Sequence, residues 1–162
     1  MRQNASGRAI ASAFLLHLRD TCLFAAGDRI IMHALLIVED DLGQLELLSA
    51  KFVRTGYRVV SVHHPRQALE AASFQQFQVA LLDGSLPEMD GLELMHRLKR
   101  TQDGVQVIFL SGGEYPIWRA KAEGAYTWLV KPCKMALLEA TIQHAFECPI
   151  NELPVWEQAP VY

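Results

Sequence analysis

The sequence predicts an α/β fold in which five parallel strands form a doubly wound sheet with helices on both faces. Two observations lead to this prediction. Short apolar runs of the kind that form buried strands alternate with longer segments whose apolar residues recur at helical spacing. The alternation repeats five times between residues 32 and 148, which indicates parallel strands joined by right-handed helical crossovers.

The composition is that of an ordinary globular protein. Of the 162 residues, 51% are hydrophobic and 20% are charged, and a chain of this length buries roughly 70% of its unfolded surface without needing disulfides or metals. The net charge of -3 provides no basic footprint for nucleic acid. Cys22, Cys133 and Cys148 are odd in number and have no CxxC spacing, which favours free thiols in a reducing compartment over a disulfide framework or a redox or metal role. No apolar run approaches the ~18 residues of a membrane span.

Residues 1–31 do not join the alternating pattern, and we expect them to form an extension. The apolar stretch 9–16 follows Arg2 and Arg8, as in a secretion signal, but it is short and charged residues end it. An amphipathic helix or a segment without fixed structure is favoured. Translation starting at Met32 is an alternative explanation of this extension. At the other end, residues 149–162 contain three prolines and no periodicity, which indicates a short tail.

The first predicted strand is 33–38, whose continuous apolar character indicates burial on both faces. The helix after it carries apolar residues at helical spacing, namely Leu42, Leu45, Leu48, Phe52 and Val53. Gly56 is suited to the position after the end of this helix. A second strand is predicted over 57–62.

Pro65 opens the second predicted helix, because a proline in the first turn loses no hydrogen bond. Its apolar residues are Ala68, Leu69 and Ala72. The third strand is predicted over 78–82 and runs into Asp83, after which glycine, serine and proline break the chain.

Asp90 is expected to cap the third helix, whose apolar face holds Leu92, Leu94, Met95 and Leu98. A fourth strand over 105–110 ends at Ser111. A short helix is predicted from about Pro116 to Glu123, followed by a fifth strand over 126–130. The last helix is predicted over 134–146, with Leu138, Ile142, Ala145 and Phe146 on its apolar face.

Residues that carry chemistry stand at the ends of four predicted strands. They are Glu39, Asp40, Asp83, Ser111 and Lys131. Singly, each has an ordinary explanation as a turn residue or a solvated charge. Because parallel strands share one carboxyl edge, where open α/β sheets bind their ligands, the joint occurrence favours a site.

The residue types indicate phosphoryl chemistry. Three neighbouring carboxylates repel each other unless a cation joins them, and hard oxygen ligands suit Mg²⁺. The hydroxyl of Ser111 and the ammonium of Lys131 are suited to hold phosphate oxygens. The set therefore predicts nucleophilic attack by Asp83 on a phosphorus atom, with an acyl phosphate as product.

Over about residues 32–148 the chain resembles the receiver domain of two-component response regulators, of the single-domain chemotaxis type. Four pieces in order carry the resemblance: 35–41, 81–83 with 86–91, 110–112, and 124–125 with 131–132. The resemblance implies a flavodoxin-like sheet with strand order 2-1-3-4-5. It implies a cytoplasmic signalling domain rather than an enzyme acting on a separate substrate.

By this resemblance Asp83 is the phosphoacceptor. Asp40 and the backbone carbonyl of Ser85 join Asp83 as Mg²⁺ ligands, and Glu39 completes the acidic pocket. The implied phosphodonor is a histidine kinase or a histidine phosphotransfer protein. A downstream protein target and a phosphorylation-dependent dimer are further expectations, whereas nucleic acid and membrane are not expected as partners.

The resemblance also implies a conformational switch. Ser111 takes the place of the switch hydroxyl and Lys131 that of the family's lysine, whereas Trp128 stands where receivers usually have Tyr or Phe. The stretch after Ser111 is shorter than is common, and Ser85 occupies a position that influences dephosphorylation. These departures concern signal output and lifetime rather than the phosphorylation chemistry.

The expected function is therefore that of a stand-alone receiver that signals by docking or by passing the phosphoryl group onward. One alternative is a receiver-like scaffold that binds partners constitutively, with switching impaired by Trp128 and the short helix. Another is a Mg²⁺-dependent aspartyl phosphatase. Such enzymes often place a second Asp two residues after the nucleophile, where this chain has Ser85, so this alternative is disfavoured.

Overall fold

The computed structural model of the protein describes residues 33–112, 119–120 and 123–148. These residues contain a five-stranded parallel sheet in the order β2-β1-β3-β4-β5, which confirms the predicted fold and strand order. The predictions for the extension at 1–31, for the tail at 149–162 and for most of the short helix at 116–123 lie outside the described residues.

The strands are short and the central ones are wholly buried. Their bounds are β1 Ala34–Val38, β2 Arg58–Val62, β3 Val79–Asp83, β4 Gln106–Ser111 and β5 Thr127–Val130. Every residue of β1, β3 and β4 is buried, as their continuous apolar runs predict for strands covered on both faces. The ladder pairs Asp83 with Leu110 and Ser111 with Val130, so both polar residues belong to strands instead of following them.

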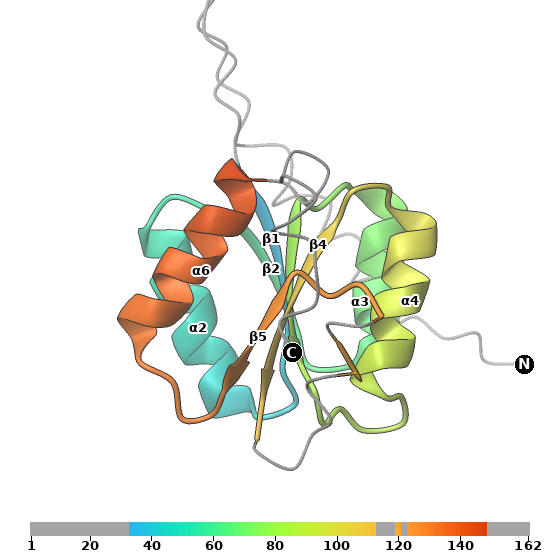
Figure 1. Ribbon diagram of the computed structural model, residues 1–162, viewed down its shortest axis with the longest axis horizontal. Helices are drawn as coiled ribbons and strands as arrows, with labels where there is room; N and C mark the ends of the chain where they lie inside the picture. The colour runs from blue at the N-terminus through green and yellow to red at the C-terminus, as the bar shows by residue number, and fades with distance from the viewer. Residues whose placement is uncertain (1–32, 113–118, 121–122, 149–162) are drawn as a thin grey trace, which may run out of the picture. The chain divides into compact units, whose positions relative to one another are not determined.

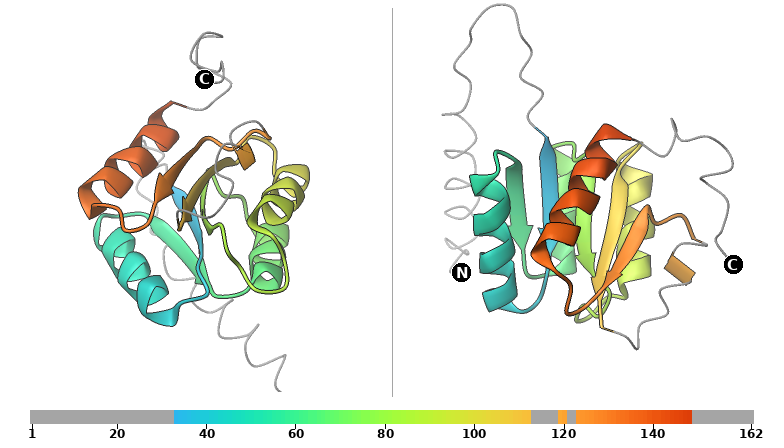
Figure 2. Two further views of the ribbon diagram at one scale, coloured as in Figure 1. Left: turned by 60° about the horizontal axis from the view of Figure 1, so that its bottom comes forward. Right: turned by 60° about the vertical axis from the view of Figure 1, so that its left-hand side comes forward.

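Helices cover both faces of the sheet, as Figures 1 and 2 show. Their bounds are α2 Leu42–Arg54, α3 Pro65–Phe74, α4 Gly91–Thr101 and α6 Met135–Glu147. Helices α2 and α6 lie on one face, and α3 and α4 lie on the other (Figure 1). None of the described helices combines the length and the apolar character that crossing a membrane requires.

Side chains cap the N-termini of three of these helices by accepting hydrogen bonds from backbone N–H groups. Asp90 accepts from the backbone N–H of Leu92 at 2.7 Å, which confirms its prediction as the cap of α4. Asp41 caps α2 and His64 caps α3 in the same way. The capped ends of these helices lie at the carboxyl edge of the sheet, because each helix directly follows a strand.

Alternate residues of the strands divide the core into two layers. Leu35 and Ile37 of β1 face α2 and α6, while Leu36 and Val38 face α3 and α4.

The predicted apolar face of α2 was too wide. Leu45, Leu48 and Phe52 are buried as expected, but Leu42 is 66% exposed and Val53 is 55% exposed. Both lie at the ends of the helix, away from the stripe that meets the sheet.

Candidate functional site

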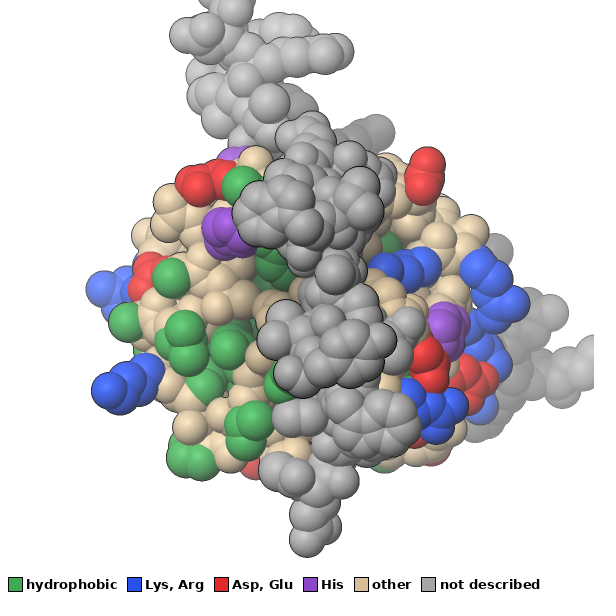
Figure 3. All heavy atoms as spheres, in the orientation of Figure 1, with side chains coloured by type: hydrophobic (Ala, Val, Ile, Leu, Met, Phe, Trp, Pro, Cys, Tyr) green, Lys and Arg blue, Asp and Glu red, His purple; other side chains and the backbone are tan. Residues whose placement is uncertain are grey.

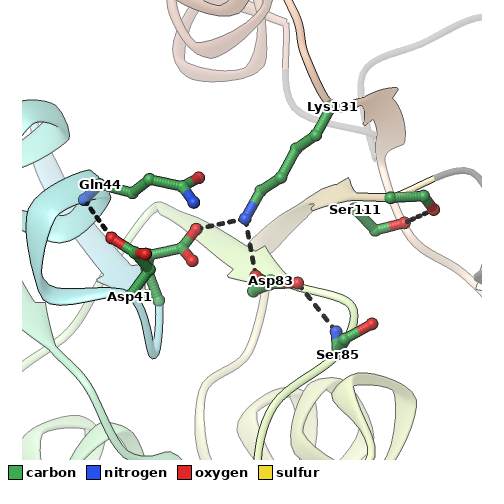
Figure 4. Close-up of polar contacts among 8 residues, drawn as sticks. Asp41, Gln44, Asp83, Ser85, Ser111 and Lys131 are labelled. Atoms are coloured by element: carbon green, nitrogen blue, oxygen red, sulfur yellow. Dashed lines mark hydrogen bonds and ion pairs between the residues drawn. The ribbon is translucent and has the colours of Figure 1, made fainter.

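The carboxyl edge of the sheet brings together residues that are far apart in the sequence. Asp83 is the last residue of β3, Glu39 directly follows β1, and Lys131 directly follows β5. The Lys131 Nζ atom donates to Glu39 Oε2 at 2.6 Å and to Asp83 Oδ2 at 2.7 Å (Figure 4). One ammonium group therefore joins the ends of three strands.

This ion cluster is largely shielded from solvent. Glu39 is 2% exposed and Asp83 is 7% exposed. Burial, together with the negative charge of Asp83, raises the pKa of Glu39 from 4.5 to about 7, although Lys131 opposes the shift. Burial alone lowers the pKa of Lys131, but its hydrogen bonds to Asp83 and Glu39 outweigh that effect and raise the pKa above 10.5.

Three carboxylates at this edge are placed close enough together to hold a cation. Glu39, exposed Asp40 and Asp83 each offer an oxygen atom, and these atoms lie within 4.8 Å of one another. Glu39 Oε1 is buried and has no hydrogen-bond partner among the described residues. An unpartnered buried carboxylate oxygen beside two other carboxylates fits a hard divalent cation such as Mg²⁺.

The loop between β3 and α4 is built closely against Asp83. The backbone N–H of Ser85 donates to Asp83 Oδ1 at 2.8 Å, so both carboxylate oxygens of Asp83 have a donor. At the far end of the loop, a Cβ atom on Gly91 would lie 2.9 Å from the Asp83 carbonyl oxygen and 2.9 Å from the ring of Phe109. The first residue of α4 must therefore be glycine for the helix to approach the strand end this closely.

The backbone of Ser111 contacts the site, but its hydroxyl points away from Asp83. The backbone N–H of Lys131 donates to the Ser111 carbonyl oxygen at 2.8 Å. The Ser111 hydroxyl donates to the carbonyl oxygen of Gly112 at 3.1 Å and does not point at Asp83 (Figure 4). The side chain is wholly buried, so any approach to Asp83 requires a rotation within the protein.

Trp128 lies in β5 opposite Phe109 and packs against the core layer under α3 and α4. Its side chain is partly exposed. Its expected part in a conformational switch stays a prediction.

Two further features of this edge were not predicted. Asp41 accepts from the backbone N–H of Gln44 at 2.8 Å and caps α2, so it does not join the three clustered carboxylates. The Asp-x-x-Gln spacing was an available signal, because it resembles a capping box. The second is the contact between His64 Nε2 and Glu88 Oε2 at 3.2 Å. No local pattern in the sequence signals it.

Comparisons with known proteins agree on one family. A family profile described as response regulator receiver domain matches residues 35–143. The chain is 31% identical over 115 residues to transcriptional regulatory protein GlrR of Escherichia coli, covering 70% of this chain and 26% of that protein. It is 39% identical over 107 residues to transcriptional activator protein PfeR of Pseudomonas aeruginosa, covering 65% and 35% respectively. It is 34% identical over 100 residues to sporulation initiation phosphotransferase F of Bacillus subtilis, covering 60% of this chain and 81% of that protein.

Solved structures give the same result. Chemotaxis protein CheY4 of Vibrio cholerae superposes with a TM-score of 0.65 at 28% identity, covering 70% of this chain and 98% of that one. The receiver domain of sensor histidine kinase PA1611 of Pseudomonas aeruginosa, solved with magnesium coordinated in its active-site cleft, superposes with a TM-score of 0.63 at 28% identity. That comparison covers 71% of this chain and 98% of the receiver.

Proposed function

This chain belongs to the response regulator receiver domain family, and we propose that it accepts a phosphoryl group on Asp83 from a histidine kinase or a histidine phosphotransfer protein. The observation that supports this most strongly is the Lys131 ammonium, which contacts Asp83 and Glu39 at 2.7 and 2.6 Å. An ammonium group held beside a nearly buried carboxylate places a positive charge where the phosphoryl oxygens arrive when that carboxylate acts as a nucleophile.

We propose that the reaction depends on Mg²⁺. Asp40, Asp83 and the backbone carbonyl of Ser85 would hold the ion, with Glu39 contributing indirectly. When bound, Mg²⁺ neutralises charge on the phosphoryl oxygens. The unpartnered Glu39 Oε1 and the spacing of the three carboxylates support this assignment. The magnesium in the related PA1611 receiver supports the choice of metal.

The chain's own residues have separable parts in the transfer. An Asp83 carboxylate oxygen attacks the phosphorus atom, a P–O bond forms, and the P–N bond to the donor histidine breaks. Lys131, which already touches Asp83, is placed to contact the oxygens of the transferred group. Glu39 shares the same ammonium and competes for it before transfer. The near-complete burial of Asp83 limits the water available for hydrolysis of the product.

Transfer would add about -1.5 to -2 charge at Asp83. We propose that the Ser111 hydroxyl then leaves Gly112 and donates to the phosphoryl oxygens. Because Ser111 is buried and hydrogen-bonded to Lys131 through its backbone, this rotation would shift the packing around β5 and Trp128. Such a population shift between two packings is what a partner protein would read.

The chain spans about a quarter to a third of the length of GlrR and PfeR, but it covers most of sporulation initiation phosphotransferase F. We propose that output follows the latter pattern, by docking to a protein target or by onward transfer of the phosphoryl group. The mass of the natively expressed protein tests whether the receiver acts without an appended output domain.

The proposed chemistry is tested with Mg²⁺ and acetyl phosphate as a small phosphodonor. Intact-mass measurement should show one added phosphoryl group that is labile to base, and the Asp83→Asn variant should show none. A constitutive scaffold predicts partner binding that ignores Mg²⁺ and the phosphodonor. An aspartyl phosphatase predicts continuous turnover of a phosphomonoester. An equal mass gain in wild type and Asp83→Asn would exclude Asp83 as the acceptor.

A further inference from the structure

We propose that His64 is a positioning residue that acts through Glu88 to hold the phosphoacceptor loop, defined as residues 84–90, in its working conformation. The inference rests on the proposed function, because this loop carries the Ser85 carbonyl that we assign to the Mg²⁺ site. His64 itself touches neither Asp83 nor the other carboxylates of the ion cluster in any described contact.

The two nitrogens of the His64 ring have different roles, because one accepts a hydrogen bond and the other donates one. Nδ1 accepts from the backbone N–H of Arg66 at 3.2 Å and so caps α3. Nε2 lies 3.2 Å from Glu88 Oε2, where a ring N–H donates to the carboxylate. The neutral form with the proton on Nε2 satisfies both contacts at once. The cap therefore orients the ring so that it reaches Glu88.

Glu88 is the residue in the loop that most needs an external restraint. Its φ angle is 65°, in the left-handed region that side chains other than glycine seldom adopt. The backbone N–H of Met89 donates to the carbonyl oxygen of Pro87 at 2.8 Å and closes a tight turn around Glu88. Such a conformation persists only when its surroundings hold it. The His64 ring, with the Arg66 guanidinium 4.0 Å away, provides that hold on the Glu88 carboxylate.

Because a cleft lies between the starts of α3 and α4, few other contacts among the described residues connect the loop to α3 there. A cleft of about 410 Å³ separates them, and both His64 and Glu88 line it. Charged side chains of both signs gather over α3 and α4 on the right of Figure 3. At the opposite ends of the two helices, the Gln102 side chain joins α4 to the Ala72 carbonyl oxygen of α3 at 2.9 Å. Near the site, the His64–Glu88 pair links the two sides of the cleft.

The ends of the phosphoacceptor loop are fixed independently of His64. Ser85 is hydrogen-bonded to Asp83 at the start, and Asp90 caps α4 at the end. In the middle of the loop, Leu86 and Met89 pack against the core, and the exposed Glu88 side chain adds the contact to His64. Loss of that contact should therefore loosen the turn at Glu88 and, through it, the backbone that leads back to Ser85, while the strand and the helix on either side stay in place. A looser carbonyl at Ser85 is a poorer Mg²⁺ ligand.

The test compares His64→Asn, Glu88→Ala and the double variant, with His63→Asn as the matched control at an exposed neighbour. Asparagine keeps the cap of α3 but is too short to reach Glu88. Hydrogen exchange of residues 84–90 without metal and calorimetric Mg²⁺ affinity are measured for each protein. Each single variant should exchange faster in the loop and bind Mg²⁺ about twofold to fivefold more weakly, as expected for the loss of one partly exposed polar contact. The double variant should be no worse than either single variant.

Loss of Mg²⁺ affinity in Glu88→Ala, which leaves the His64 cap of α3 in place, is the result that a merely structural cap would not produce. Unchanged loop exchange and unchanged affinity in His64→Asn would overturn the inference, as would additive losses in the double variant. If wild type binds Mg²⁺ and takes up phosphoryl while His64→Asn behaves identically, the inference fails alone. If wild type does neither, the proposed function fails and takes the inference with it.

Discussion

At the residue scale, the site depends on one ammonium shared by two carboxylates. Lys131 offsets the cost of burying Glu39 and Asp83, but it cannot satisfy all four of their oxygens. The cost of burying charge that Lys131 does not offset is seen at Glu39, whose pKa is raised to about 7 mainly by burial. A buried Glu39 oxygen that has no donor among the described residues favours the binding of a cation beside it.

The raised pKa of Glu39 predicts a specific dependence of stability on pH. A carboxyl whose folded-state pKa exceeds its unfolded value of 4.5 contributes stability below pH 4.5 and loses it as the pH rises to about 7. In the absence of Mg²⁺, wild type should lose on the order of 2 kcal/mol between pH 4.5 and 7 relative to Glu39→Gln. Denaturant unfolding at several pH values measures this difference. Parallel pH profiles of the two proteins would contradict it.

Gly91 is a second residue at which local geometry sets the site. Alanine there would place a Cβ atom 2.9 Å from the Asp83 carbonyl oxygen, so α4 or the strand end must move. We expect Gly91→Ala to lower the free energy of unfolding by about 1–3 kcal/mol and to slow phosphorylation of Asp83. Gly112→Ala is the control, because a Cβ atom there meets nothing within 4 Å. Equal stability of both variants, measured by chemical denaturation, would argue against the close contact.

At the element scale, neighbouring acidic residues after β1 have different tasks. Asp41 begins α2, whereas exposed Asp40 belongs to the carboxylate cluster. Asp41→Ala should lower the free energy of unfolding by about 1 kcal/mol and leave Mg²⁺ affinity nearly unchanged.

Asp40→Ala should weaken Mg²⁺ binding and leave the stability of the helix unchanged, because it removes a proposed metal ligand and a repulsive charge but no helix cap. Thermal unfolding and Mg²⁺ titration of both variants measure the two effects. A loss of Mg²⁺ affinity in Asp41→Ala as large as that in Asp40→Ala would refute this division.

The elements themselves were largely predictable from the sequence, since apolar runs and helical spacing follow directly from burial. The ends of the strands were less predictable. Asp83 and Ser111 belong to β3 and β4 because they pair with residues of neighbouring strands, and a local sequence pattern does not signal such pairing. The meeting of Glu39, Asp83 and Lys131 followed from the shared edge of a parallel sheet. The direction of the Ser111 hydroxyl did not, because a hydroxyl rotates to suit its surroundings. The His64–Glu88 pair joins residues 24 positions apart that no periodicity relates.

At the scale of the whole molecule, the account requires that chemistry at one edge of the sheet alters packing elsewhere. Trp128 is the natural reporter, because it is partly exposed and packs against the core beside β4. With Mg²⁺ and acetyl phosphate, tryptophan emission of wild type should change, and the change should be smaller in Trp128→Phe. The other two tryptophans of the chain remain in both proteins as an internal reference. No change in wild type would favour the scaffold with impaired switching.

The central claim is that residues from three strands converge into one Mg²⁺-dependent phosphoacceptor centred on Asp83. The most direct measurement locates the modification itself. After reaction with acetyl phosphate and Mg²⁺, the acyl phosphate is trapped by borohydride reduction and the protein is mapped by peptide mass spectrometry. The account predicts a single modified position, Asp83, that disappears when Mg²⁺ is chelated. Modification at Glu39 or Asp40, or labelling of Asp83 that persists without the metal, would contradict it.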